Sequence, residues 1–301
     1  MEISFLIPTR NRPENLKKNL LYLNKLNIQN LHSEIIVLDD CSELSYDSIL
    51  LEFENIQYFK NPTPMGISYV RNKLAQYAKG KYLIFLDDDV TVDKNLNVRS
   101  LFEFFESDRK LGLIAFNITA FLDSNTVYGK INSSEQNLSK ETIKQIPFKK
   151  YQLYFTPDLY ETINYVTYFI GAAFACKKSV FNNKIEFDEL FFWGNEELDF
   201  SYNLIKNDYS LIYHPEFKAN HFPKKSVINA NTQKINSFNL FISNRILTAY
   251  KSLPLLNALT YITVWMTYYF FLSLLKFRFY DWILGIKMGI KKTNYSNRKL
   301  G

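Results

Sequence analysis

Three short apolar runs alternate with amphipathic segments in the first 90 residues, and this alternation limits the possible folds more than any other feature. The runs are residues 3–7, 34–38 and 81–86, and polar or acidic side chains follow each within two residues. Between them, residues 14–26 and 68–78 carry apolar side chains at helical spacing. This pattern predicts an α/β fold with a mostly parallel sheet covered on both faces. Because ligands bind at the carboxyl ends of such strands, the residues after each run are candidate site residues.

The composition excludes disorder and argues against a disulfide-rich secreted domain. Hydrophobic residues make up 47% of the 301 residues, which is enough for a substantial core. The cysteines, Cys41 and Cys176, have no metal-ligand spacing and fit a reducing, cytosolic setting. The chain begins with a strand pattern and lacks the basic, apolar and small-residue parts of a secretory leader. We therefore expect the first domain to stay in the cytosol.

The net charge of +6 does not indicate a nucleic-acid partner. A nucleic-acid binder carries a basic stripe interleaved with aromatic residues on one element, and the first 240 residues contain none. Lys and Arg instead recur around an apolar region at the C-terminus. That arrangement favours an anionic membrane surface as the partner.

The chain divides into two predicted parts. Residues 1–250 form one predicted domain with two halves, 1–120 and 121–250, which the family resemblance described below makes a nucleotide-binding and an acceptor-binding half. The polar, weakly periodic stretch 121–165 is an insertion or acceptor-side region. Residues 251–301 form an apolar and basic tail, which we expect to be helical.

The acidic triplet after the third strand is the first candidate site. In extended backbone Asp87 and Asp89 point to one side and Asp88 to the other. Two carboxylates on one side suit a hard divalent cation such as Mg²⁺ or Mn²⁺. Such a cation neutralises a diphosphate leaving group. The alternative is a solvated acidic turn, although the apolar strand directly before the triplet argues against it.

Four segments in order resemble the motifs of glycosyltransferase family 2. Residues 8–12 (PTRNR) resemble its first nucleotide-contacting loop, and residues 37–42 (VLDDCS) its second, with Cys41 where the family usually has Gly. Residues 66–72 (GISYVRN) resemble its Gly-x-Ser/Ala-x-Ala-Arg-Asn segment, and the acidic triplet falls where the family has Asp-x-Asp. The resemblance implies a GT-A fold and an inverting transfer from a nucleotide-sugar donor.

The resemblance also implies roles for individual residues. Asp39 accepts a hydrogen bond from the imide N–H of a uracil or thymine, and Arg71 supplies positive charge beside the nucleotide. A solvated helix face is the alternative for Arg71. Close packing of a strand against a helix is the alternative for Gly171, which resembles a small residue lining the donor-sugar pocket. The implied nucleotide-sugar-binding residues are Pro8, Thr9, Arg10, Arg12, Asp39, Asp40, Gly66, Arg71, Asp88 and Gly171.

The resemblance completes the implied metal site with a histidine at the end of a later strand. His221 takes this role rather than His214, because it stands at the strand's end. A lone histidine is more often a structural residue than a metal ligand, and only the match of the flanking residues to the family favours a metal ligand here. The implied cofactor is Mn²⁺ or Mg²⁺ held by Asp87, Asp89 and His221.

A second acidic cluster begins a predicted helix and resembles the family's acceptor-side segment, which ends in Glu-Asp-x-Asp. The alignment makes Glu197 the general base that deprotonates the acceptor hydroxyl. Glu196 and Asp199 remain alternatives, because Glu stands where the family has Asp. The implied acceptor-side residues are Trp193, Gly194 and Glu196. All three acids also complement the helix dipole, which is the purely structural alternative.

The C-terminal tail opens with an uncharged stretch, Leu253–Leu275, about 34 Å long if helical. A single membrane crossing would leave the following basic residues outside the cytosol, against the positive-inside tendency. Asn257 and three threonines (Thr260, Thr263 and Thr267) also give this helix a less apolar sector. We expect helices that lie peripherally or monotopically in the cytosolic interface. A single span and a buried helical cap are the alternatives.

Taken together, these features predict a glycosyltransferase on the cytoplasmic side of the membrane. Its partners are a nucleotide-sugar donor, most simply a UDP-sugar, and a glycan or lipid-linked saccharide acceptor. Cell-surface polysaccharide or lipopolysaccharide assembly is the expected pathway. A nucleotidyltransferase is one alternative, although it needs a Gly-rich phosphate loop that residues 8–12 lack. A non-catalytic sugar-binding module is another, although it would have lost the acidic positions.

Overall fold

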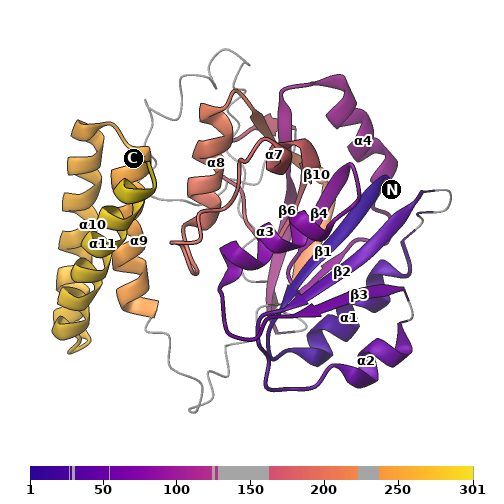
Figure 1. Ribbon diagram of the computed structural model, residues 1–301, viewed down its shortest axis with the longest axis horizontal. Helices are drawn as coiled ribbons and strands as arrows, with labels where there is room; N and C mark the ends of the chain where they lie inside the picture. The colour runs from indigo at the N-terminus through magenta and orange to yellow at the C-terminus, as the bar shows by residue number, and fades with distance from the viewer. Residues whose placement is uncertain are drawn as a thin grey trace.

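The computed structural model places the chain in an α/β body with a unit of three helices beside it (Figure 1). It describes residues 1–26, 28, 31–53, 55–123, 126–127, 163–222 and 237–300. Most of the polar stretch expected to form an insertion, 121–165, lies outside the described residues.

The body and the C-terminal unit contain these elements. The strands are β1 (Ile3–Thr9), β2 (Ser33–Asp39), β3 (Ile56–Lys60), β4 (Tyr82–Leu86), β5 (Val90–Val92), β6 (Leu111–Asp123), β7 (Thr126–Val127), β8 (Asn164–Tyr165), β9 (Ala173–Lys177) and β10 (Ser210–His221). The helices are α1 (Pro13–Leu23), α2 (Asp47–Glu52), α3 (Ile67–Tyr77), α4 (Val98–Ser107), α7 (Lys178–Asn182), α8 (Glu196–Lys206), α9 (Ser237–Ser252), α10 (Leu255–Leu275) and α11 (Phe279–Leu300).

The sheet has the order β3-β2-β1-β4-β9-β6-β10-β5 and is parallel from β3 to β4. The second half is mixed, because β9 runs antiparallel to both β4 and β6. β2 and β3 lie on one side of β1 and β4 on the other, so the winding reverses at β1. Such a reversal leaves a crevice at the carboxyl ends of β1 and β4, where ligands bind in open α/β sheets. Thr9 and Asp87 lie at this crevice.

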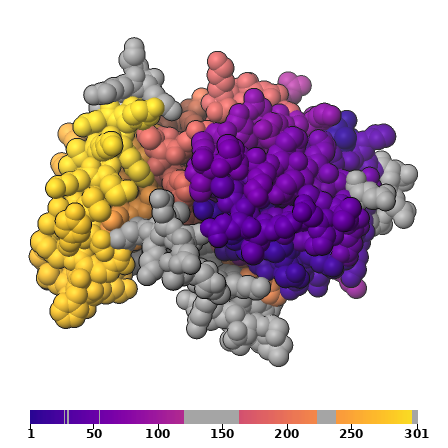
Figure 2. Space-filling view, turned by 60° about the horizontal axis from the view of Figure 1, so that its bottom comes forward, coloured from indigo at the N-terminus to yellow at the C-terminus, as the bar shows by residue number. Residues whose placement is uncertain are grey.

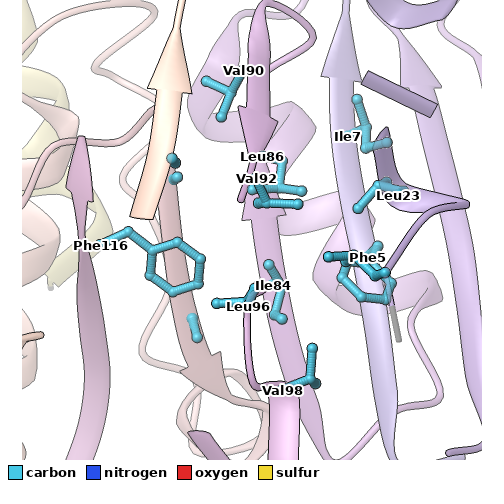
Figure 3. Close-up of a cluster of buried hydrophobic side chains, with 14 of the residues drawn as sticks. Phe5, Ile7, Leu23, Ile84, Leu86, Val90, Val92, Leu96, Val98 and Phe116 are labelled. Atoms are coloured by element: carbon cyan, nitrogen blue, oxygen red, sulfur yellow. The ribbon is translucent and has the colours of Figure 1, made fainter. Parts of the chain in front are cut away.

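The predicted strands and helices of the first 90 residues form because their apolar side chains alternate as the sequence indicates. All seven residues of β1 are buried. Phe5 and Ile7 face the α1 side, where Leu23 packs against them (Figure 3), and Leu6 faces the opposite core layer. Pro13 stands in the first turn of α1, where its missing N–H costs nothing. β1 is therefore packed on both faces, by one core cluster on each side.

The C-terminal unit packs α9 against both α10 and α11, around a cluster that includes Phe238, Ile242 and Tyr269. α9 also contacts α8 of the α/β body. In the space-filling view the C-terminal helices, in yellow, lie alongside that body (Figure 2). The unit is therefore joined to the α/β body through α9.

α10 presents an apolar face that is largely exposed in the described part of the chain. Leu259, Phe271 and Leu275 are 56%, 59% and 79% exposed. Thr260 and Thr263 lie on this same side, and each hydroxyl donates to a carbonyl of its own helix. Among the described residues α10 is the one helix long and apolar enough to cross a bilayer, and 22% of its apolar window is buried.

Candidate active site

Asp87, Asp88 and Asp89 form the turn between β4 and β5, at the crevice described above. The Val90 N–H donates to the Asp87 carbonyl over 3.1 Å and closes this turn. The expectation that the triplet continues β4 in extended backbone is therefore wrong. Asp88 and Asp89 do not point to opposite sides, because both contact Arg12 Nη1, at 3.2 and 2.7 Å.

The loop after β1 holds Asp88 in place. Thr9 Oγ1 donates to Asp88 Oδ2 over 2.8 Å and lies 2.9 Å from the Tyr46 hydroxyl. Burial is the main cause that raises the pKa of Asp88 to about 7. Pro8 is buried within β1, and Arg10 is half-buried just beyond it. Thr9 therefore contacts the acidic turn, whereas Pro8 is buried within β1.

His221, at the end of β10, lies against the same turn. Its Nε2 is 3.2 Å from Asp89 Oδ1. Burial acts to lower the pKa of His221, but the contact with Asp89 and the charge of Asp87 raise it above the usual value. His214 is buried and stacks on Phe217, with ring centroids 4.1 Å apart. Of these two histidines on β10, His221 is the one that lies beside Asp89.

The donor set of Asp87, Asp89 and His221 fits a hard divalent cation in its chemistry, because it offers carboxylate oxygens and an imidazole nitrogen. Within the residues that the structure describes, however, no three Asp, Glu, His or Cys side chains already converge as metal ligands do. Arg12 is paired with Asp89 and Arg71 with Asp87. A cation at this turn must therefore compete with the two guanidinium groups.

Asp39, at the end of β2, is fully buried and already has three hydrogen bonds. Its Oδ1 accepts from the backbone N–H and the hydroxyl of Ser42, at 2.8 and 2.5 Å. Its Oδ2 accepts from the Tyr58 hydroxyl at 2.7 Å. These bonds fix the carboxylate at the base of the second loop. A base that contacts Asp39 must share it with Ser42 and Tyr58.

Asp40 organises the chain that leads into α3. It accepts hydrogen bonds from Asn61 Nδ2 and from the backbone N–H groups of Met65 and Gly66, at 2.8–3.0 Å. Gly66 has a φ of +89°, and a Cβ there would lie 2.6 Å from a ring carbon of Phe192. The glycine is therefore required both by its backbone conformation and by this close approach.

The first turn of α3 is bound to the segment that precedes α8. The Ile67 N–H donates to the Phe192 carbonyl over 3.0 Å, and Ser68 Oγ donates to the Phe191 carbonyl over 2.6 Å. These bonds join segments more than 120 residues apart. They bring the second acidic cluster of the sequence to the crevice.

Arg71 of α3 is the centre of the site. Its side chain is 2% exposed, and its two terminal nitrogens contact Glu196 Oε1 at 3.3 Å, Glu197 Oε1 at 3.7 Å and Asp87 Oδ1 at 3.5 Å. Nη2 also donates to the Gly171 carbonyl over 3.0 Å. Arg71 does not lie on a solvated helix face. It links the acidic turn after β4 to the acids that open α8.

Gly171 precedes β9 and lies against this guanidinium. A Cβ at Gly171 would overlap Glu197 Oε1 and lie 2.6 Å from Arg71 Nη2. Close packing against helices, the structural alternative for this glycine, is therefore present, and its neighbours are the charged side chains of Arg71 on α3 and Glu197 on α8. The position admits no side chain while Glu197 keeps its place.

The three acids at the start of α8 have different surroundings. The Glu196 side chain is 3% exposed, and burial, followed by the nearby Glu197, raises its pKa to about 8. The Glu197 side chain is 16% exposed, so it is the most accessible of the three. Asp199 is buried and lies 2.8 Å from Lys251 Nζ of α9. Only Glu196 and Glu197 contact Arg71, whereas Asp199 faces the C-terminal unit.

The turn before α8 carries the remaining predicted residues, Trp193 and Gly194. The Trp193 ring is 49% exposed and lies 5.3 Å from the ring of Phe241 on α9. The carbonyls of Trp193 and Gly194 both accept from Asn244 Nδ2. The exposed indole is available to a ligand, while the backbone of the turn is held by α9.

Sequence reasoning missed several residues of the site. Tyr58, on β3, and Tyr46, just before α2, contact the strand-end residues, but single tyrosines carry no recognisable pattern. Asn244 and Lys251 on α9 hold the acceptor-side segment. The sequence does contain a pattern that could have identified Asn244 and Lys251. They are polar residues at helical spacing between the apolar residues of α9.

A family model and a curated relative both match most of the chain. The family model described as glycosyl transferase family 2 matches residues 4–183, more than half of the chain. An uncharacterized glycosyltransferase of Methanocaldococcus jannaschii is 28% identical over 221 residues, which cover 71% of this chain and 68% of that protein.

Two solved structures share the fold. S. aureus TarS in complex with UDP-GlcNAc has a TM-score of 0.62 at 15% identity, over 97% of this chain and 82% of that chain. GalNAc-T7 with UDP, GalNAc and Mn²⁺ has a TM-score of 0.62 at 18% identity, and 83% of this chain spans about half (51%) of that chain. At these identities the likeness shows the fold, which is GT-A. The family model covers both strand-end loops and the acidic turn, and the chain therefore belongs to glycosyltransferase family 2.

Proposed function

We propose that this glycosyltransferase moves a sugar, with inversion, from a nucleoside-diphosphate donor to a hydroxyl of a glycan or lipid-linked acceptor. A UDP-sugar is the proposed donor, and cell-surface polysaccharide or lipopolysaccharide assembly is the proposed pathway. The observation that carries the proposal is the position of Arg71, which joins the acidic turn to Glu197 across the crevice. Membership of family 2 argues against the nucleotidyltransferase alternative.

In this proposal the crevice at β1 and β4 receives the donor. Arg12 and Thr9 shape the wall next to the acidic turn, and Asp39 with Tyr58 forms the base-binding end. Asp87, Asp89 and His221 would hold Mn²⁺ or Mg²⁺, whose charge offsets that of the departing diphosphate. These placements follow the contacts described above together with the family resemblance.

Glu197 is the proposed general base, which takes the proton of the acceptor hydroxyl. It is more accessible than Glu196 and, unlike Asp199, is not paired with Lys251. Arg71 keeps the Glu197 carboxylate close to the crevice. Trp193, exposed on the turn before α8, offers a flat apolar surface on which a sugar ring can stack.

The test of the function is release of nucleotide from a panel of UDP-, GDP- and dTDP-sugars, with and without lipid-linked saccharide acceptors. We expect one uridine donor to give acceptor-dependent release. Acceptor-independent binding without any release would favour the non-catalytic sugar-binding module. Release with a guanosine donor alone would overturn the choice of nucleotide.

Replacement of single aspartates should separate the proposed metal ligands from their neighbour. Asp89→Ala should abolish Mn²⁺-dependent turnover, because Asp89 adjoins His221. Asp88→Ala should cost less, because Asp88 contacts Thr9 and Arg12 rather than His221. Turnover is measured against metal concentration in both variants. Equal losses, or full activity of the unaltered protein in chelator, would contradict the assignment.

We also propose that the C-terminal unit lies on the cytosolic face of the membrane. The apolar face of α10 is exposed, and so are Lys276 at the end of α10 and Lys287 and Lys291 on α11. Buried apolar area together with attraction to anionic lipid is what holds an interfacial helix to a bilayer. The hydroxyls of Thr260 and Thr263 are satisfied within α10, so they do not oppose this contact.

Charges placed on the α10 face should release the protein from lipid. The triple variant Leu259→Glu, Phe271→Glu and Leu275→Glu should bind anionic vesicles roughly tenfold or more weakly, because three apolar contacts are lost. Leu51→Glu is the matched control, since Leu51 is 84% exposed on α2 of the α/β body. Sedimentation with vesicles measures binding, and high salt or carbonate should release the unaltered protein. Unchanged binding of the triple variant, or complete resistance to carbonate, would contradict the interfacial location.

A further inference from the structure

One face of α9 carries three polar side chains that contact the segment 188–199. They are Asn244, Thr248 and Lys251, which are four and three residues apart and therefore share a face. Asn244 and Thr248 are fully buried. Buried polar groups need hydrogen-bond partners, and each of the three has at least one partner in that segment.

Asn244 holds the turn before α8. Its Nδ2 lies 2.9 Å from the Trp193 carbonyl and 2.6 Å from the Gly194 carbonyl, so one amide group ties two successive carbonyls. Its Oδ1 accepts from Lys292 Nζ of α11 over 2.7 Å. This bond orients the amide so that its N–H groups face the turn.

Thr248 and Lys251 continue the same contact along the segment. Asn195 Nδ2 donates to Thr248 Oγ1 over 3.1 Å. Lys251 Nζ lies 2.5 Å from Asp188 Oδ2 and 2.8 Å from Asp199 Oδ2. Both ends and the middle of the segment are therefore attached to α9.

The attached turn leads directly into the proposed base. Asn195 has a left-handed backbone conformation with a φ of +69°, and α8 begins at the next residue. Glu197 is three residues beyond Gly194. A small displacement of a reacting group is costly, since an error of about 1 Å can reduce the rate roughly 10²-fold. The conformation of the turn therefore sets the position of the Glu197 carboxylate.

We propose that Asn244 is a positioning residue of the transferase, which acts by holding the Trp193–Gly194 turn and through it Glu197. The inference rests on the proposed role of Glu197. α9 also packs against α10 and α11. The C-terminal unit therefore supports the acceptor-side turn through Asn244, in addition to its proposed contact with the membrane.

Two substitutions test this role. Asn244→Asp keeps the size of the side chain and its contact with Lys292 but removes the two N–H donors. Asn244→Ala removes the donors without adding a charge. The matched control is Ser243→Ala, because Ser243 is also buried on α9 but its hydroxyl donates to the Leu240 carbonyl of the same helix.

We expect both Asn244 variants to lower kcat for transfer by about 10- to 100-fold, with the donor KM changed by less than about twofold. Ser243→Ala should keep the kcat of the unaltered protein. Thermal unfolding is recorded first, and the kinetics are compared at a temperature at which every variant is folded. A kcat of Asn244→Ala equal to that of Ser243→Ala would overturn the proposal.

Hydrogen exchange of the full chain gives a readout that does not need activity. The amides of the peptide covering residues 188–199 should exchange faster in both Asn244 variants and not in Ser243→Ala. If the unaltered protein transfers no sugar, the proposed function fails, yet the exchange rates still decide whether Asn244 holds the turn. Unchanged exchange in the Asn244 variants would overturn the positioning role even in an active enzyme.

Discussion

Glu197→Gln should reduce transfer to the acceptor by about 10²–10⁴-fold, the usual contribution of a general base, while donor affinity persists. Glutamine keeps the size of the side chain, but it cannot take the proton of the acceptor hydroxyl. Arg71 keeps its contacts with Asp87 and Glu196 in this variant, so the donor side should remain intact. The measurement is kcat for transfer together with the donor dissociation constant.

The neighbouring acids provide the comparison. Glu196→Gln should cost less, because Glu196 is buried and its raised pKa, about 8, already favours the neutral form at pH 7. Asp199→Asn should weaken the pair with Lys251 and so raise KM more than it lowers kcat. Near-normal transfer by Glu197→Gln, with a collapse in Glu196→Gln or Asp199→Asn, would move the catalytic role to that residue. The family assignment would be unaffected.

Arg71→Met should destabilise the fold as well as abolish activity. Removing the guanidinium leaves the carboxylates of Asp87 and Glu197 without their shared cation, and an uncompensated buried charge typically costs about 3–5 kcal/mol. For a chain of this size the midpoint of thermal unfolding should fall by on the order of 10 °C. Calorimetry at neutral pH measures the fall.

A surface arginine gives the control for Arg71. Arg99 on α4 is exposed, so Arg99→Met should change the free energy of unfolding by less than about 0.5 kcal/mol. The deficit of Arg71→Met should shrink as the pH falls, because burial raises the pKa of Asp87 and protonation of this carboxyl removes a charge that has lost its partner. If the free energy of unfolding of the Arg71→Met variant equals that of the Arg99→Met variant, Arg71 does not hold the acidic groups together as proposed.

The first half of the fold could be predicted because its signals are local. Buried strands at 3–7, 34–38 and 81–86 and helices over most of 14–26 and 68–78 are confirmed. Their apolar periodicity does not depend on distant residues. β3 was missed because it is an edge strand whose residues are only partly buried. α2 was missed because six residues are too few to show a helical period.

The candidate site was less predictable because its geometry depends on contacts between distant segments. The turn at Asp87–Asp89 closes through Val90, and local alternation cannot anticipate that reversal. The burial of Arg71 depends on Glu196 and Glu197, which are 125 or more residues away in the chain. Likewise, Asp199 faces Lys251 only because α9 packs against α8. The polar and acidic residues at the strand ends could be identified from the sequence, whereas the side chains that they contact in the fold could not.

The anomeric configuration of the transferred sugar distinguishes an inverting transfer, with Glu197 as general base, from a retaining one. Glu197 contacts Nη1 of Arg71, and Asp87 of the acidic turn contacts Nη2. With Glu197 as the proposed base, we expect the acceptor to attack opposite the departing diphosphate. NMR of the product formed by the unaltered protein should show one anomer, with a configuration opposite to that of the donor. A product that retains the donor's configuration would contradict the account.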